Sequence, residues 1–169
     1  MTSNVSARLK YRIRKEFSVD AKKNAIVVTY SIINESGETR KVAPWEITRV
    51  PNDGVISFDA PAESIWPAAL LDFIDKDGVA YYEADEAPEN RKVNADGKGW
   101  LSYEAKGLVF TKRFADLTPE QPAPGEAEIQ VYVNQGKTYI EIENQGAYTA
   151  LAPGEKLSWT VRWYLKPTE

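Results

Sequence analysis

The stretch Leu157-Ser158-Trp159-Thr160-Val161-Arg162-Trp163-Tyr164-Leu165 decides the fold class. Its apolar and polar side chains alternate with a period of two residues, which is typical of a β-strand with one face in a core. The turn signal Pro153-Gly154 lies a few residues before it. The chain therefore contains at least one amphipathic strand, and such a strand needs further strands beside it and a second layer over its apolar face.

Further alternating segments precede this one along the chain, separated by Gly, Pro and Asn turn residues. The segments with this period cover residues 9–19, 26–32, 39–50, 129–133 and 139–143. Short strands with almost no helical periodicity predict an all-β fold, an antiparallel sandwich or barrel. In the first segment Ile13, Phe17 and Val19 alternate with charged residues, which predicts a strand with one buried face.

The middle of the chain differs from its two ends. Residues 59–96 are rich in Asp and Glu, and Pro61, Pro67 and Pro88 interrupt any long element. We expect an acidic insertion with short strands or a single helical turn, within one β-sandwich domain covering residues 1–169. Four aromatic side chains are expected to attach it to the sandwich: Trp66, Phe73, Tyr81 and Tyr82.

Composition excludes several function classes. The 169 residues carry a net charge of −4, which argues against a nucleic-acid partner, and no apolar run is long enough for a membrane span. There is no Cys and no His, so thiol chemistry, histidine-based triads and most zinc sites are excluded. We expect a soluble protein without metal or cofactor. The sequence shows no signal peptide and leaves the compartment open, either cytoplasmic or, if trimmed, secreted or periplasmic.

Two pairs of segments resemble galactose mutarotase-like proteins, especially an uncharacterised bacterial branch related to aldose 1-epimerases. The segments are Tyr30–Ser36 with Ala43–Arg49, and Ile140–Gln145 with Leu151–Glu155; a weaker match covers Gly99–Leu101 and Phe110–Phe114. The resemblance implies an antiparallel β-sandwich of the galactose mutarotase-like (supersandwich) type. Because members of that superfamily are generally longer, it also implies a shortened version of the sandwich.

The resemblance implies one half of a catalytic pair. Glu143 stands where the family has its general base, and the alternation around Ile142 predicts that this carboxylate is exposed. Trp45 stands where the family has its acid histidine, and an indole cannot serve as that acid. Trp45 could instead stack on a sugar ring, or it could be a core residue.

Further substrate-binding candidates are Arg49, Tyr139, Glu141 and Arg113. Arg49 shares a strand face with Trp45, while Tyr139 and Glu141 share one with Glu143. The alternative interpretation is that the charged residues are solvated or form structural ion pairs, Arg49 with a neighbouring strand. The segment Asp75-Lys76-Asp77-Gly78 has the start of a calcium loop without its remaining ligands, and predicts a tight turn.

Three hypotheses on function remain open at this point. The first is a carbohydrate-binding or carbohydrate-related domain without ordinary epimerase activity, with a saccharide as its partner. The second is a sugar epimerase or glycosidase-like enzyme that uses carboxylates alone, which needs a second acid near Glu143. The third is a structural or interaction module, such as a homodimer assembled through open sheet edges.

Overall fold

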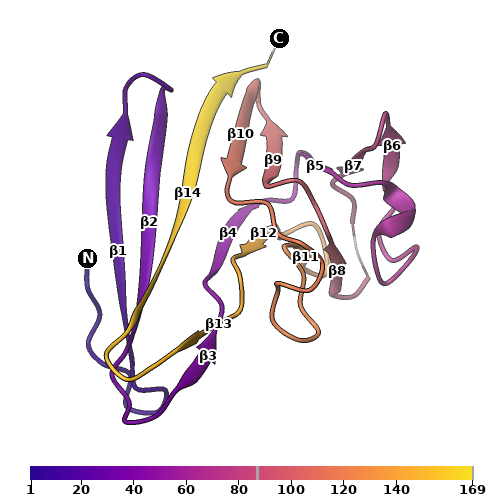
Figure 1. The fold of residues 1–169 in the computed structure, drawn as a ribbon. Helices are drawn as coiled ribbons and strands as arrows, with labels where there is room; N and C mark the ends of the chain where they lie inside the picture. The colour runs from indigo at the N-terminus through magenta and orange to yellow at the C-terminus, as the bar shows by residue number, and fades with distance from the viewer. Residues whose placement is uncertain (87, 169) are drawn as a thin grey trace.

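A computed structural model describes residues 1–86 and 88–168 as two packed β-sheets and a short ribbon (Figure 1). In spatial order, the large sheet contains β1 (Tyr11–Asp20), β2 (Ala25–Asn34), β14 (Lys156–Pro167), β10 (Leu108–Arg113), β9 (Trp100–Ala105), β5 (Val55–Asp59), β7 (Val79–Glu83) and β6 (Ile74–Lys76). The small sheet contains β4 (Trp45–Pro51), β12 (Tyr139–Gln145), β11 (Ile129–Val133) and β8 (Arg91–Ala95), and the ribbon pairs β13 (Thr149–Leu151) with β3 (Arg40–Val42).

Neighbouring strands in both sheets run antiparallel, which confirms the predicted antiparallel β-sandwich. The helical content of residues 1–86 and 88–168 is a single 3₁₀ turn at Ala62–Ser64. Within that part of the chain, no helix is long and apolar enough to span a membrane.

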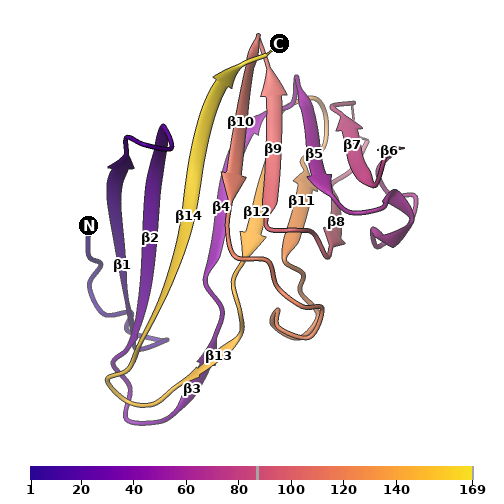
Figure 2. The same ribbon diagram turned by 45° about the horizontal axis from the view of Figure 1, so that its top comes forward.

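The hydrophobic core lies where the small sheet covers the half of the large sheet formed by β10, β9, β5 and β7 (Figure 2). Ile140 and Ile142 of β12 point inward and are fully buried, as their alternation predicted. They face fully buried side chains of the large sheet such as Phe58 and Leu101. This half of the molecule, called the sandwich half below, is therefore a complete two-layer structure.

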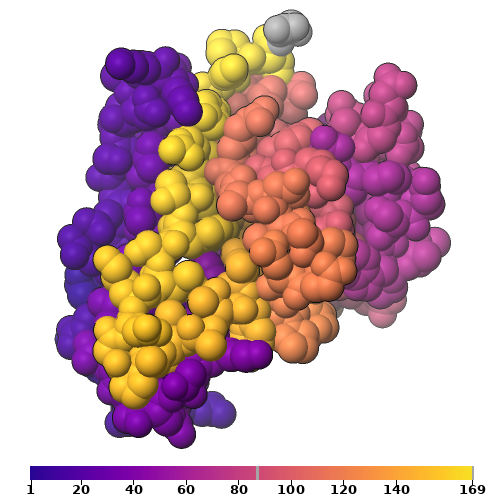
Figure 3. Space-filling model, in the orientation of Figure 1, coloured from indigo at the N-terminus to yellow at the C-terminus, as the bar shows by residue number. Residues whose placement is uncertain are grey.

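The three strands β1, β2 and β14 extend beyond the small sheet and are called the wing below (Figures 1 and 2). The space-filling view shows them as a separate column beside the rest of the molecule (Figure 3). The prediction that the first strand has a buried face is wrong, because Ile13 is 51% exposed and Val19 is 75% exposed. The physical reason is that the small sheet ends at β4, so among the described residues no strand covers β1.

The expected single strand at residues 39–50 is two strands in different sheets. β3 pairs with β13, and β4 pairs with β12. The chain passes from one to the other at Ala43-Pro44, where the proline has no N–H to donate to a ladder. This break delivers β4 to the small sheet and starts it at Trp45.

The acidic segment 59–96 contributes strands to both sheets: β6 and β7 extend the large sheet, and β8 is an edge strand of the small one. Phe73 packs between Phe58 and Tyr82, with ring centroids 5.4 and 5.6 Å apart. Tyr82 is buried, whereas Trp66 is 43% exposed. Ala87 lies outside the described residues.

The segment Asp75–Gly78 forms the predicted tight turn between β6 and β7. The Gly78 N–H donates to Asp75 Oδ1 at 3.0 Å, and Gly78 has a φ of +81°, which glycine adopts readily. The Asp75 carboxylate therefore stabilises this turn.

Candidate functional site

The candidate site is the outer face of the small sheet, called the site face below. The register of β4 and β12 places Trp45 beside Gln145, Ile47 beside Glu143, and Arg49 beside Glu141. Because side chains alternate along a strand, all of these lie on the side opposite the core. Two sequence predictions are confirmed: Trp45 and Arg49 share a face of β4, and Tyr139, Glu141 and Glu143 share a face of β12. Both faces lie on the same side of the small sheet.

Lys92 joins Trp45 and Glu143 into one cluster. It comes from β8, at the opposite edge of the small sheet, and its side chain reaches across β11. The Lys92 Nζ lies 3.2 Å from Glu143 Oε2 and 4.8 Å from the centre of the Trp45 ring. The ammonium group therefore pairs with a carboxylate and also makes a cation–π contact.

Glu143 is much less accessible than its position in the strand predicted. Its residue is 1% exposed, and it lies on the polar face beneath the side chains of its neighbours. Burial raises the pKa of the Glu143 carboxyl, and the nearby Lys92 ammonium opposes that rise. The prediction of an exposed carboxylate is therefore wrong, since alternation gives the face of a residue but not what neighbouring side chains cover.

Trp45 is 47% exposed, so it is not a core residue. Ile47, the next residue on the same face of β4, is also 47% exposed. Beside the charged Lys92–Glu143 pair, the site face thus presents an aromatic ring and an aliphatic side chain to solvent. Such a combination can stack on the apolar face of a pyranose and donate or accept hydrogen bonds at its rim.

A second cluster on the site face contains Arg49, Glu141 and Tyr139. The Arg49 guanidinium donates to Glu141 Oε1 through Nη2 at 2.6 Å and Nε at 3.2 Å, and its Cζ lies 4.0 Å from the Tyr139 ring centre. Arg49 forms an ion pair with a neighbouring strand, as the alternative interpretation held, and its partner is Glu141. Its side chain is still 62% exposed, so it remains available to a ligand.

Glu46 points away from the site face, because neighbouring residues of a strand point to opposite sides of the sheet. Its carboxylate lies 3.2 Å from the Lys112 ammonium and also accepts hydrogen bonds from Tyr30 Oη and Trp163 Nε1. Burial lowers the pKa of Lys112 to about 8, against the opposing effect of Glu46. Because Glu46 belongs to this buried network between the two sheets, it is not part of the site face.

Arg113 does not belong to the site. It lies on β10 of the large sheet, opposite Arg162 of β14 and Trp100 of β9, and is exposed on the outer side of that sheet. Its neighbour Lys112, on the opposite side of β10, is fully buried. Arg113 therefore lies apart from the other predicted substrate-binding residues, and the structure does not bring it to the site face.

Two site residues were not predicted from the sequence. Lys92 lies in the acidic segment, where the alternation of Val93 and Ala95 with polar neighbours is too short to stand out. Tyr132 lies on the site face and packs against Tyr139, with ring centroids 6.2 Å apart. The strand at residues 129–133 was predicted, but its position beside β12 depends on the register.

The residues of the site face define what it can do chemically. Over residues 1–86 and 88–168, His, Cys, Asp and Glu nowhere gather into a group of three able to hold a metal ion. The face has one buried carboxylate with a raised pKa, one ammonium group, one guanidinium and exposed aromatic rings. Its exposed groups can donate hydrogen bonds from the cations, accept them at Glu141 and stack through the aromatic rings.

Comparison with known proteins gives matches to solved structures alone. Neither the protein-family models nor the curated protein sequences contain a match to this chain. A protein from Escherichia coli K12, provisionally named an aldose 1-epimerase, superposes with a TM-score of 0.68 at 14% identity, over 99% of this chain and 64% of that protein. A TPR-domain-containing protein from Parabacteroides distasonis gives 0.67 at 16% identity, over 98% of this chain and 32% of that protein.

A galactose mutarotase-like protein from Lactobacillus casei also superposes, with a TM-score of 0.57 at 9% identity, over 96% of this chain and 72% of that protein. The chain therefore has a galactose mutarotase-like β-sandwich fold, as the sequence resemblance implied. It spans less than two thirds of the length of the Escherichia coli and Parabacteroides distasonis proteins.

Proposed function

We propose that this chain is a carbohydrate-binding domain that holds a saccharide on the site face and lacks ordinary epimerase activity. The observation that carries the proposal is the half-exposed Trp45 ring beside the Lys92–Glu143 pair. The names of the structurally similar proteins, which refer to aldose 1-epimerase and galactose mutarotase, support the choice of a sugar as ligand.

The arrangement suits a pyranose because such a ring has an apolar face of C–H groups and a rim of hydroxyl groups. Trp45 offers a flat surface for the apolar face, while Lys92 and Arg49 offer cationic donors for hydroxyl or carboxylate oxygens. Glu141 offers an acceptor for hydroxyl protons, while the buried Glu143 holds the Lys92 ammonium in place. Both cations are already paired, so the polar groups are held in place before a ligand arrives.

Ordinary mutarotation needs an acid as well as a base. Glu143 is suited to act as the base, since burial raises the pKa of its carboxyl. The position that resembles the family's acid histidine is Trp45, which cannot donate a proton to a ring oxygen. Loss of one acid–base partner lowers a rate by roughly 10²–10⁴-fold, so we expect binding with little acceleration of anomer exchange.

The test is saturation-transfer NMR of the protein with galactose, glucose, galacturonic acid and glucuronic acid, with anomer exchange measured in the same samples. We expect saturation transfer to at least one of these sugars and its loss in Trp45→Ala. Ile74→Ala is the control, because Ile74 is an exposed apolar side chain on β6 of the large sheet, outside the site face. Absence of transfer from all four sugars, or equal loss in both variants, would contradict the proposal.

A carboxylate-based enzyme is a second candidate, and the position of Glu141 supports it. Glu141 and Glu143 are two residues apart on one strand face, so their backbones are separated by roughly 6.6 Å. Paired carboxylates in glycoside chemistry lie roughly 5–10 Å apart. Anomer exchange or hydrolysis of a nitrophenyl glycoside that disappears in both Glu141→Gln and Glu143→Gln would favour this candidate; a rate equal to that of buffer would exclude it.

A further inference from the structure

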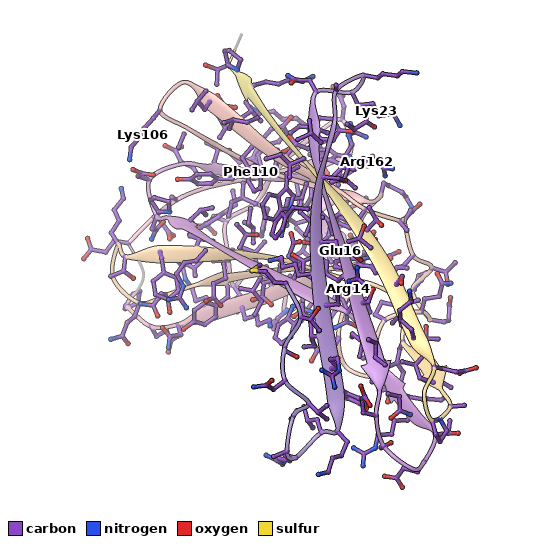
Figure 4. The ribbon with its side chains drawn as sticks, turned by 90° about the vertical axis from the view of Figure 1, so that its left-hand side faces the viewer. Arg14, Glu16, Lys23, Lys106, Phe110 and Arg162 are labelled. Carbon is purple, nitrogen blue, oxygen red and sulfur yellow. The ribbon has the colours of Figure 1, made fainter. Side chains whose placement is uncertain are left out.

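The inner face of the wing is an apolar surface that is uncovered over β1 and parts of β2 and β14, whereas Trp159 and Val161 of β14 are buried. It is the side of β1, β2 and β14 that continues the core-facing side of the large sheet, and large side chains on it are exposed. Its most exposed members are Ile13 at 51%, Phe17 at 49%, Val19 at 75%, Ile26 at 45% and Leu165 at 58%. Figure 4 views the wing from its free edge, with Phe110 and Arg162 on opposite sides of the large sheet. An apolar sheet face of this kind marks a surface that packs against another protein.

The free edge of the wing is less available than its face. Residues Met1–Ser3 lie along the first half of β1: the Ser3 N–H donates to the Ile13 carbonyl at 2.8 Å, and the Lys15 N–H donates to the Met1 carbonyl at 2.8 Å. These bonds occupy outward backbone groups in the first half of β1, so a strand of another molecule could pair only with its second half. The wing therefore favours association through its face over association through its edge.

The inner face is nearly free of charge. Lys15 is the one charged residue among the inward positions of the three wing strands, which otherwise bear aliphatic or aromatic side chains apart from Asn34 at the end of β2. The Lys15 ammonium lies 4.9 Å from the Tyr30 ring centre and 5.4 Å from that of Phe17, so aromatic rings partly offset its charge. A strongly charged partner finds few groups to pair with on this face, Lys15 and, at the rim of the adjoining groove, Lys41 and Glu126, whereas an equally apolar partner can pack against most of it.

We propose that the partner is a second copy of this chain, and that two wings pack face to face about a two-fold axis parallel to their strands. This orientation is the one in which the two sandwich halves project to opposite sides and do not collide. Each wing then lies in the layer of the other copy's small sheet, next to its edge strand β4. The arrangement gives both wings the second layer that each lacks.

The size of the surface fits a stable dimer. Three strands of about ten residues form a footprint of roughly 33 Å by 14 Å, and side chains corrugate it. Its accessible area is therefore of the same order as the roughly 800 Å² per partner that stable interfaces bury. Two grooves of about 530 and 320 Å³ lie along the wing; Ile13 and Tyr30 line the first, which Trp45 of β4 borders on its other side, and Val19, Ile26 and Leu165 line the second. Side chains projecting from the partner would fill them.

The first experiment measures the oligomeric state by sedimentation velocity over a concentration series. We expect the unmodified chain to form a dimer and Val19→Lys to shift it to monomer, because Val19 lies on the inner face. The matched control is Ser18→Lys, which places the same charge on the opposite face of the same strand and leaves the dimer intact. A monomer at every concentration, or a dimer that survives Val19→Lys, would overturn the proposal.

The second experiment identifies by cross-linking which face of the wing forms the contact. Because the chain has no Cys, an introduced cysteine is its only thiol. With the axis running along β2, Ile26 of one copy faces Ile26 of the other, so Ile26→Cys is expected to give a covalent dimer with a short bis-maleimide. Val27→Cys, on the opposite face of β2, is expected to give no covalent dimer under the same conditions. The reverse pattern would show that the copies associate through the outer face. Neither experiment involves a sugar, so its outcome is independent of the proposed function.

Discussion

The sandwich half and the wing are built from the same sequence pattern but differ in what covers them. Ile142 in β12 and Ile13 in β1 both alternate with charged residues, yet Ile142 is fully buried and Ile13 is 51% exposed. The small sheet covers β10, β9, β5 and β7 and stops at β4, so the difference arises from sheet order and not from the strands themselves. Alternation thus predicts a strand and its apolar face, but a second layer decides whether that face is buried.

The two regions also differ in buried charge. The carboxylates of Glu46, Glu128 and Glu143 and the ammonium of Lys112 are all buried between or upon the sheets of the sandwich half. The charged side chains of β1, in contrast, are either partly or fully exposed to solvent. We therefore expect substitutions of charged residues in the sandwich half to change the free energy of unfolding, and its dependence on pH, far more than substitutions in the wing.

The largest effect is expected at the buried ion pair. Glu46→Ala leaves the Lys112 ammonium buried without its carboxylate, and we expect the free energy of unfolding to fall by about 3–5 kcal/mol. The matched wing variant is Lys15→Ala, which removes a partly exposed lysine and is expected to cost less than about 1 kcal/mol. Urea unfolding measures both; similar losses would contradict the contrast between the two regions.

The next effect compares two isoleucines. Ile142→Ala creates a cavity in the core and is expected to lower the free energy of unfolding by about 2–5 kcal/mol. Ile13→Ala removes atoms that are already half in water, so its cost is expected to be below about 1 kcal/mol in protein dilute enough to be monomeric. If Ile13→Ala proved as costly as Ile142→Ala in the monomer, the wing would have a covering layer.

A third effect concerns pH. Burial raises the pKa of Glu128 to about 7 from its ordinary value of 4.5, although its carboxylate accepts hydrogen bonds from the Gly97 and Gly99 N–H groups. Between these two values the folded chain holds a proton that the unfolded chain has lost, so stability falls as pH rises from about 4.5 to about 7.

The expected fall due to Glu128 is about 3 kcal/mol, and Glu128→Gln is expected to remove it. Raised pKa values at Glu143 and Asp96 contribute in the same direction and leave a residual slope. The measurement is urea unfolding at several pH values for both proteins. Superimposable pH profiles would show that Glu128 does not ionise inside the fold as described.

The smallest effect is expected on the outer face of the wing. Arg14 and Glu16 form an ion pair of 2.7 Å in which both side chains are about half exposed. Water and salt screen such pairs, so Arg14→Ala is expected to change the free energy of unfolding by no more than about 0.5 kcal/mol. A loss of several kcal/mol on thermal or urea unfolding would mean that this face, too, is packed against another surface.

Much of the site could be predicted because a strand has a fixed period. The opposite orientations of Trp45 and Glu46, and the inward position of Ile142, follow from the pleat alone. The contact of Lys92 with Trp45 and Glu143 could not be predicted, because it depends on the order of β4, β12, β11 and β8. The burial of Glu143 and the separation of Arg113 from the site depend on sheet order as well.

The most direct test of the saccharide site uses the indole N–H signals of the five tryptophans in a ¹H–¹⁵N correlation spectrum. Trp45 lies on the site face, whereas Trp163 lies on the inner side of the wing strand β14, hydrogen-bonded to Glu46. On titration with galactose or galacturonic acid, the signal absent from Trp45→Phe is expected to move while that of Trp163 stays in place. Movement of Trp163 alone, or of no indole signal, would contradict a saccharide site on the small sheet.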